Sequence, residues 1–237
     1  MARQHFKAGT LTAPLPAVMV SVGDMENANI ITIGWTGILS SDPPRTYISV
    51  RPSRHSHKII SETGEFVINL TNESLALATD YAGIYTGAKV DKFKVTGLTK
   101  EKSLAVSAPT IKEAPVSLEC RVFDVIESGT HDIFMADIVN VSCDGELIDE
   151  SGRICFERAG LVAYSHGEYY ALGRRLGKFG YSTGLDISEI ALSEAEREMG
   201  CAVKKPPKAK KAEKEKPKGW AKPKQKKKGK KKARAEK

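Results

Sequence analysis

The chain has 237 residues, 41% of them apolar, and a formal net charge of +8. The charge is unevenly distributed: residues 204–237 hold 18 Lys and Arg against 3 Glu, which leaves residues 1–203 with a net charge of −7. The basic character therefore belongs to one end of the chain and does not identify its body as a nucleic-acid binder.

Two further classes of protein are disfavoured by the sequence. No segment approaches the roughly 18–20 apolar residues of a membrane span, and the N-terminus lacks the apolar run of a signal sequence, so we expect a cytoplasmic protein without a membrane partner. The four cysteines, at positions 120, 143, 155 and 201, form no C-x-x-C pair. His55 and His57 lie two residues apart but have no third ligand nearby in the sequence, so no metal site is expected.

Short β-branched runs bounded by turn residues dominate the first two thirds of the chain. Between residues 116 and 122 apolar residues at even positions alternate with polar residues at odd positions, which is the pattern of a half-buried strand. Gly129 and Asp144–Gly145 mark expected hairpin turns after the long runs. We expect strands at residues 15–22, 30–35, 46–50, 65–70, 116–127, 132–142 and 160–164.

Helical signals are fewer and local. We expect helices at residues 56–63, ended by Gly64; at 74–81, ended by Gly83; and at 193–199, which begins with an S-x-x-E capping box and is ended by Gly200. Strands interrupted by a few short helices, without strand–helix alternation, predict a mainly β fold, namely a closed or split β-barrel.

Residues 204–237 consist mainly of lysine, alanine, proline and glycine, with Trp220 as the one large apolar residue. Such a composition does not offset the entropy cost of folding, so a disordered Lys-rich tail is expected. We therefore predict a barrel domain at residues 1–187, a short C-terminal helix at 188–203 and a basic tail at 204–237.

Several motifs follow one another in a distinctive order. Residues 29–35 read N-x-x-T-x-x-W, residues 43–44 are a Pro-Pro turn, and residues 48–56 read I-S-V-R-P-S-R-H-S. Residues 86–93 (TGAKVDKF), 131–134 (HDIF) and 170–180 follow further along. Over about residues 10–182 the chain resembles the flavin reductase-like, FMN-binding split-barrel family, which includes the flavoredoxins.

The residue types agree with a flavin mononucleotide (FMN) site. Arg51, Ser53, Arg54 and Ser56 immediately precede an expected helix, where arginine forks, hydroxyls and free backbone N–H groups favour a phosphate. Residues 32–37 offer an apolar seat with polar groups at its edge for the isoalloxazine ring. The predicted cofactor-binding residues are Asn29, Thr32, Trp35, Thr36, Gly37, Ser49, Val50, Arg51, Ser53, Arg54, Ser56, Asp91 and Lys92.

The resemblance alone implies several further roles. It implies that Asp91 and Lys92 approach the cofactor, often from the partner subunit of a homodimer. It also implies that His131 faces the flavin and guides the nicotinamide, although a purely structural strand histidine is nearly as good an interpretation. Because no G-x-G-x-x-G fingerprint follows a strand, NAD(P)H is expected to bind transiently over the flavin.

The sequence is compatible with three functional hypotheses. The first is an enzyme, an NAD(P)H-dependent flavin reductase that transfers a hydride to the flavin. The second is a flavoredoxin-like FMN electron carrier, reduced by a redox partner protein. The third is a barrel protein whose basic tail binds nucleic acid or another acidic surface weakly and in a salt-dependent manner.

Overall fold

The computed structural model describes residues 3–184, so the expected C-terminal helix and basic tail lie outside the described residues. Its contacts divide the chain into two units, Met1–Leu176 and Gly177–Lys237. The described part of the second unit, residues 177–184, consists of turns closed by backbone hydrogen bonds from Tyr181 to Lys178 and from Thr183 to Gly180. All the helices and strands described below lie in the first unit.

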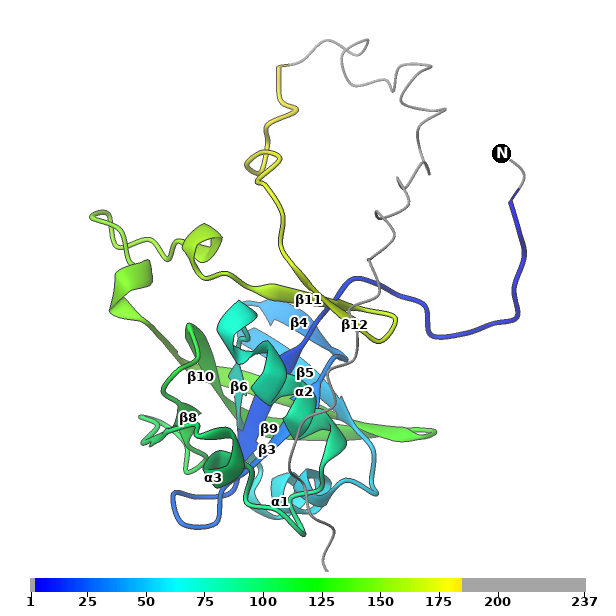
Figure 1. The fold of residues 1–237 in the computed structure, drawn as a ribbon, viewed down its shortest axis with the longest axis vertical. Coiled ribbons are helices and arrows are strands. Elements are labelled where there is room, and N and C mark those ends of the chain that lie inside the picture. The colour runs from blue at the N-terminus through cyan, green and yellow to red at the C-terminus, as the bar shows by residue number, and fades with distance from the viewer. Residues whose placement is uncertain (1–2, 185–237) are drawn as a thin grey trace, which may run out of the picture. The chain divides into compact units, whose positions relative to one another are not determined.

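A seven-stranded sheet with antiparallel neighbours forms the centre of the first unit (Figure 1). The strands lie in the order β3 (Asn29–Ile33), β2 (Val18–Val22), β6 (Glu65–Asn69), β9 (Val116–Ser128), β10 (His131–Cys143), β5 (Pro44–Val50) and β4 (Thr36–Ser41). The backbone N–H of Ser49 on β5 also donates to the carbonyl of Trp35, directly before β4, at 2.9 Å, which continues the pairing of β4 with β5. Only Gly34 and Trp35 separate β3 from β4, so the chain itself links the two edge strands of the sheet, and the fold is the mainly β split barrel that the sequence predicts.

Two smaller sheets accompany the barrel. One consists of β1 (Leu15–Pro16), β11 (Val162–Ser165) and β12 (Glu168–Ala171), and the other of β7 (Lys100–Glu101) and β8 (Thr110–Ile111). The single strand expected at residues 15–22 is therefore wrong, because β1 pairs with β11 whereas β2 pairs with β3 and β6. The chain changes sheets at Ala17.

Three α-helices lie beside the sheet: α1 (His55–Thr63), α2 (Ala76–Ile84) and α3 (Lys92–Thr96). Short 3-10 turns occupy Glu73–Leu75, Gly145–Leu147 and Phe156–Arg158. Gly64 ends α1 in a left-handed conformation, as predicted, and the Gly129 turn joins β9 to β10. Gly83 does not end α2, and Asp144–Gly145 begins a 3-10 turn rather than a hairpin. Within residues 3–184, none of the helices is long and apolar enough to cross a membrane.

Strands β2 and β3 are buried on both faces, which explains why most of their residues are apolar. One face, with Val18, Val20 and Ile31, packs inside the barrel around Phe66 and Phe134. On the other face, Met19 and Ile30 belong to a second cluster with Ala82 of α2 and Phe93 of α3. The second cluster fixes α2 and α3 against β3, at the place where the candidate site lies.

A buried carboxylate fixes a loop beside β9. Glu119 is 1% exposed and accepts hydrogen bonds from the backbone N–H groups of Leu104 (3.0 Å) and Ala105 (2.6 Å) and from the Asn140 amide (2.8 Å). Burial raises the pKa of Glu119, but these hydrogen bonds together outweigh burial and hold the pKa below its ordinary value. The carboxylate is thereby satisfied without a cationic partner.

Candidate functional site

A cavity of about 310 Å³ lies at the ends of β3 and β5; we call it the strand cavity. Its lining includes the apolar side chains of Ile31, Ile33 and Val50. Trp35 and His131 also line it, with ring centroids 4.5 Å apart. Apolar side chains beside two aromatic rings suit a flat heterocycle. Six of the predicted cofactor-binding residues line this cavity: Thr32, Trp35, Ser49, Val50, Arg51 and Arg54.

A second cavity, of about 320 Å³, lies next to the first; we call it the basic cavity. Arg51 and Arg54 line both cavities, as does Ile31, so the two share a wall. The basic cavity contains the predicted residues Asn29, Arg51, Ser53, Arg54, Ser56 and Lys92. Three cationic side chains, two serines and an amide are the donor set that a phosphate requires.

Lys92 is the most deeply buried cation of the basic cavity, with 4% of its surface exposed. Its ammonium group donates to the backbone carbonyls of Ile30 (2.6 Å) and Ala82 (2.7 Å). An ammonium has three N–H donors, so one remains for a ligand in the cavity. Burial, together with the charge of Arg54, lowers the pKa of Lys92 to about 8. Lys92 thus lines the basic cavity of its own chain, whereas the family resemblance implies an approach that often comes from the partner subunit.

The Asn29 side chain lies close to Ser56 and Gly87 in the lining of the basic cavity. The Asn29 amide donates to the hydroxyl of Ser56 at 2.8 Å, and Ser56 is 1% exposed. A Cβ atom at Gly87 would lie 2.1 Å from the Asn29 side-chain oxygen. Only glycine at position 87 therefore leaves the Asn29–Ser56 hydrogen bond in place.

His131 is the one predicted catalytic residue, and it lies between two spaces. It lines the strand cavity and also an outer groove of about 730 Å³, whose other residues include Leu39, Tyr47 and Ile126. Burial lowers the pKa of His131, and the charges of Arg51 and Arg54 lower it further. The neutral imidazole is therefore favoured at neutral pH.

Three predicted cofactor-binding residues lie elsewhere. The hydroxyl of Thr36 donates to the carbonyl of Tyr47 at 2.6 Å, and Thr36 lines the outer groove. Gly37 packs against the Tyr47 ring, and Asp91 caps α3 by accepting from the backbone N–H of Lys94 at 3.1 Å. None of the three lines either cavity, and their roles toward a cofactor remain predictions.

Distant segments supply a part of the strand cavity that no sequence motif indicates. Asp80 and Gly83 come from α2, and Tyr164 and Tyr169 from β11 and β12. The sequence pattern predicts a helix end at Gly83; in the structure Gly83 lines the cavity, and its carbonyl accepts a hydrogen bond from Arg54 at 3.3 Å. No sequence motif connects these residues with the arginine turn, residues 51–56, so only the tertiary structure shows that they share its cavity.

His57 contacts a carboxylate and an aromatic ring. Its Nε2 lies 2.7 Å from a carboxylate oxygen of Asp132, and its ring packs edge-on against Phe134. Within residues 3–184, no group of three His, Cys, Asp or Glu side chains is arranged to hold a metal ion.

Comparison with known proteins connects this geometry to a family. Residues 11–173 match the model of the flavin reductase like domain. The chain belongs to this family. The matched residues contain both cavities, and flavin reductase-like proteins with solved structures share the split-barrel fold.

Two solved flavin reductase-like structures are similar over nearly their whole length. The flavoredoxin of Desulfovibrio vulgaris (Miyazaki F) is 32% identical with a TM-score of 0.72, covering 78% of this chain and 100% of that one. The flavoredoxin from Methanosarcina acetivorans is 25% identical with a TM-score of 0.69, covering 76% and 99%. An FMN reductase (NADH) of Agrobacterium fabrum is 24% identical over 103 residues, which are 44% of this chain and 57% of the relative.

Proposed function

We propose that this chain binds FMN and reduces it with NAD(P)H, with the ring in the strand cavity and the phosphate in the basic cavity. One observation carries the proposal: a cavity with three cationic side chains shares a wall with a cavity that is lined by two aromatic rings and several apolar side chains. FMN combines a phosphate with a flat aromatic ring, so the two donor sets fit its two ends.

The residues of the shared wall would orient the cofactor. Arg51 and Arg54 line both cavities, so a phosphate bound by their guanidinium groups would lie next to the cavity that holds the flavin ring. Ile31, which also belongs to both, excludes water between them. A bound flavin supplies hydride acceptance and onward electron transfer, so the protein needs to contribute position and electrostatics more than acid–base groups.

We assign His131 to the nicotinamide side of the site. Its ring is packed on Trp35 and lines the outer groove as well as the strand cavity. A neutral imidazole adds no charge repulsion toward an oxidised, cationic nicotinamide product. This position supports the role that the family resemblance implies for His131.

An electron carrier is the second candidate, and the similarity to two flavoredoxins favours it. A carrier would bind FMN in the same two cavities but would receive electrons from a protein partner. The FMN reductase (NADH) relative supports the reductase instead.

A visible spectrum of the purified full chain, before and after anaerobic addition of NADH or NADPH, tests the proposal. We expect a yellow protein, or one that becomes yellow with added FMN, whose flavin absorbance bleaches with a pyridine nucleotide. Bleaching with a protein donor alone would identify the carrier. A protein that stays colourless after reconstitution would refute FMN binding.

We also propose that a second copy of the chain covers the outer groove. This groove exposes apolar side chains, since Leu39 and Ile126 are each 46% exposed. Contiguous exposed apolar surface of this kind is typical of interaction sites. A homodimer would also shield the Trp35 side of the strand cavity from water.

Sedimentation of the full chain tests the dimer. We expect a dimer for the unmodified protein and a monomer for Leu39→Glu, which places a charge in the groove. Leu77→Glu is the matched control, since Leu77 is 84% exposed on α2 and lies outside the groove. An unmodified protein that sediments as a monomer would contradict the proposal.

A further inference from the structure

Helix α2 presents a carboxylate to the strand cavity. Asp80 lines this cavity, and Gly83, one turn later on the same side of the helix, lines it as well. The other charged or titratable side chains in the wall are Arg51, Arg54 and His131, besides the two tyrosines. Asp80 is therefore the one acidic group of the strand cavity among the described residues.

Backbone contacts on both sides of Asp80 fix its position. The hydroxyl of Thr32 on β3 donates to the carbonyl of Thr79, and the Arg54 guanidinium donates to the carbonyl of Gly83. A Cβ at Gly83 would lie 3.2 Å from the Cβ of Thr32, so glycine allows α2 to pack this closely on β3. Asp80 lies between these two attachment points.

Tyr169 on β12 lines the same cavity as Asp80. Burial, and then the negative charge of Asp80, raise the pKa of Tyr169 to about 12. The hydroxyl proton therefore stays on the tyrosine. The Tyr169 ring packs edge-on against Tyr164, with centroids 5.2 Å apart. Within residues 3–184, Asp80 takes part in none of the ion pairs.

We propose that Asp80 lowers the reduction potential of the flavin bound in the strand cavity. This inference rests on the proposed FMN site. Reduction increases the electron density of the ring, which a neighbouring carboxylate disfavours and the two arginines favour. Asp80 thus opposes Arg51 and Arg54 and keeps the reduced flavin a strong electron donor.

The test is the anaerobic equilibration of the FMN-loaded full chain with a redox dye of known potential. We expect Asp80→Asn to increase the ratio of reduced to oxidised flavin at a fixed dye ratio by about threefold to thirtyfold, the range for one charge at a partly solvated site. Asp80→Ser, which is also neutral, should do the same if asparagine is not accommodated.

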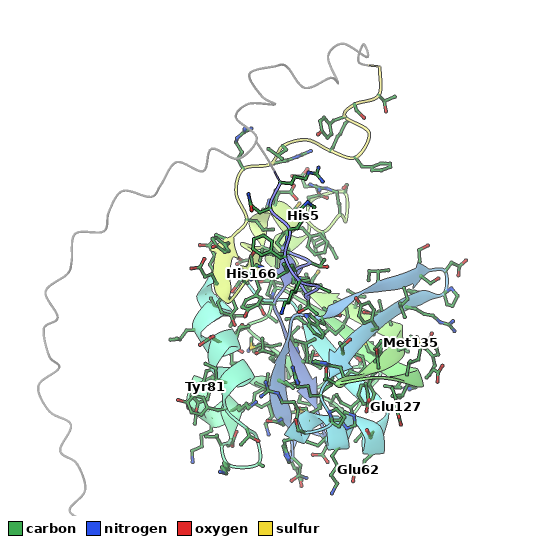
Figure 2. All side chains as sticks on the ribbon, turned by 90° about the vertical axis from the view of Figure 1, so that its right-hand side faces the viewer. His5, Glu62, Tyr81, Glu127, Met135 and His166 are labelled. Carbon is green, nitrogen blue, oxygen red and sulfur yellow. The ribbon has the colours of Figure 1, made fainter. Side chains whose placement is uncertain are left out.

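Two controls separate charge from structure. Tyr169→Phe keeps the carboxylate, so it should not shift the ratio toward reduced flavin. Glu62→Gln removes a carboxylate on α1 (labelled in Figure 2) that pairs with Lys58 at 3.6 Å. Glu62 lines neither cavity, so this variant should leave the ratio unchanged.

The possible results are distinguishable. An unchanged ratio in both Asp80 variants, or equal shifts in Asp80→Asn and Tyr169→Phe, would overturn the inference while leaving the FMN site intact. Failure of the unmodified chain to take up FMN would overturn the proposed function and this inference together.

Discussion

The ammonium group of Lys92 makes the affinity for FMN depend on pH in a way that follows from the structure. Burial among backbone carbonyls lowers its pKa to about 8 in the empty site. A phosphate in the basic cavity favours the charged form and so raises this pKa. Because the lysine must be protonated to bind the phosphate well, raising the pH should weaken FMN binding.

The size of the effect follows from the fraction of protein that carries the proton. With a pKa of about 8 in the empty site, only about one molecule in eleven is protonated at about pH 9, and the apparent dissociation constant rises in proportion. If the phosphate restores the pKa to an ordinary lysine value of about 10.4, the affinity falls by about tenfold between about pH 7 and pH 9, or roughly 1.4 kcal/mol.

Fluorescence titration with FMN and with riboflavin, which lacks the phosphate, is the assay. The flavin ring titrates identically in both ligands, so the ratio of their affinities isolates the phosphate. We expect this ratio to decline above about pH 8 in the unmodified chain. In Lys92→Met the ratio should be lower at neutral pH, by roughly 10- to 150-fold for a lost charged hydrogen bond of about 1.5–3 kcal/mol, and flat with pH. A ratio that stays constant with pH in the unmodified chain would refute the reasoning.

Three further predictions concern the groups that support the site. Glu119→Gln should lower the free energy of unfolding by about 1.5–3 kcal/mol at neutral pH. Folding lowers the pKa of Glu119, so the ionised carboxylate stabilises the fold above the pKa of the unfolded chain and this stabilisation is lost on acidification. In urea denaturation, the difference in unfolding free energy between the unmodified chain and Glu119→Gln should therefore shrink below about pH 4.3. A difference that is constant with pH would contradict the role given to Glu119. Gly87→Ala should displace the Asn29 amide and weaken FMN binding more than riboflavin binding. Gly145→Ala is the control, because no atom lies within 4 Å of its added Cβ, and it should change neither affinity. Equal affinities in the unmodified chain and both variants would argue against the Gly87 contact. Phe66→Ala, at the centre of the barrel core, should cost about 3–5 kcal/mol in the same denaturation assay, and a cost below about 1 kcal/mol would show that the barrel interior repacks.

The barrel strands and the arginine turn follow from local sequence because local forces set them. Alternating apolar residues between positions 116 and 122 and the glycine at 129 specify the β9–β10 hairpin, which the structure contains. The turn from Arg51 to Ser56 ends a strand and begins α1. Each of these features depends on residues close together in the chain.

Elements without a local signal were missed. Strand β4 carries mostly exposed or half-buried residues, so its sequence shows no apolar alternation. Helix α3 has five residues, too few for a helical period. Gly83 reads locally as a helix end, but α2 continues to Ile84 because the absent side chain allows contact with Thr32 on β3.

The sequence by itself determined that a mainly β body precedes a basic tail, and that one turn is suited to a phosphate. Only the tertiary structure decided which other groups share the site. Packing of α2 on β3 places Asp80 in the lining of the strand cavity, and β12 contributes Tyr169 to the same cavity. Helix α3 places Lys92 in the lining of the basic cavity. These segments are distant in the chain, and their meeting depends on the burial of a common core that no local pattern encodes.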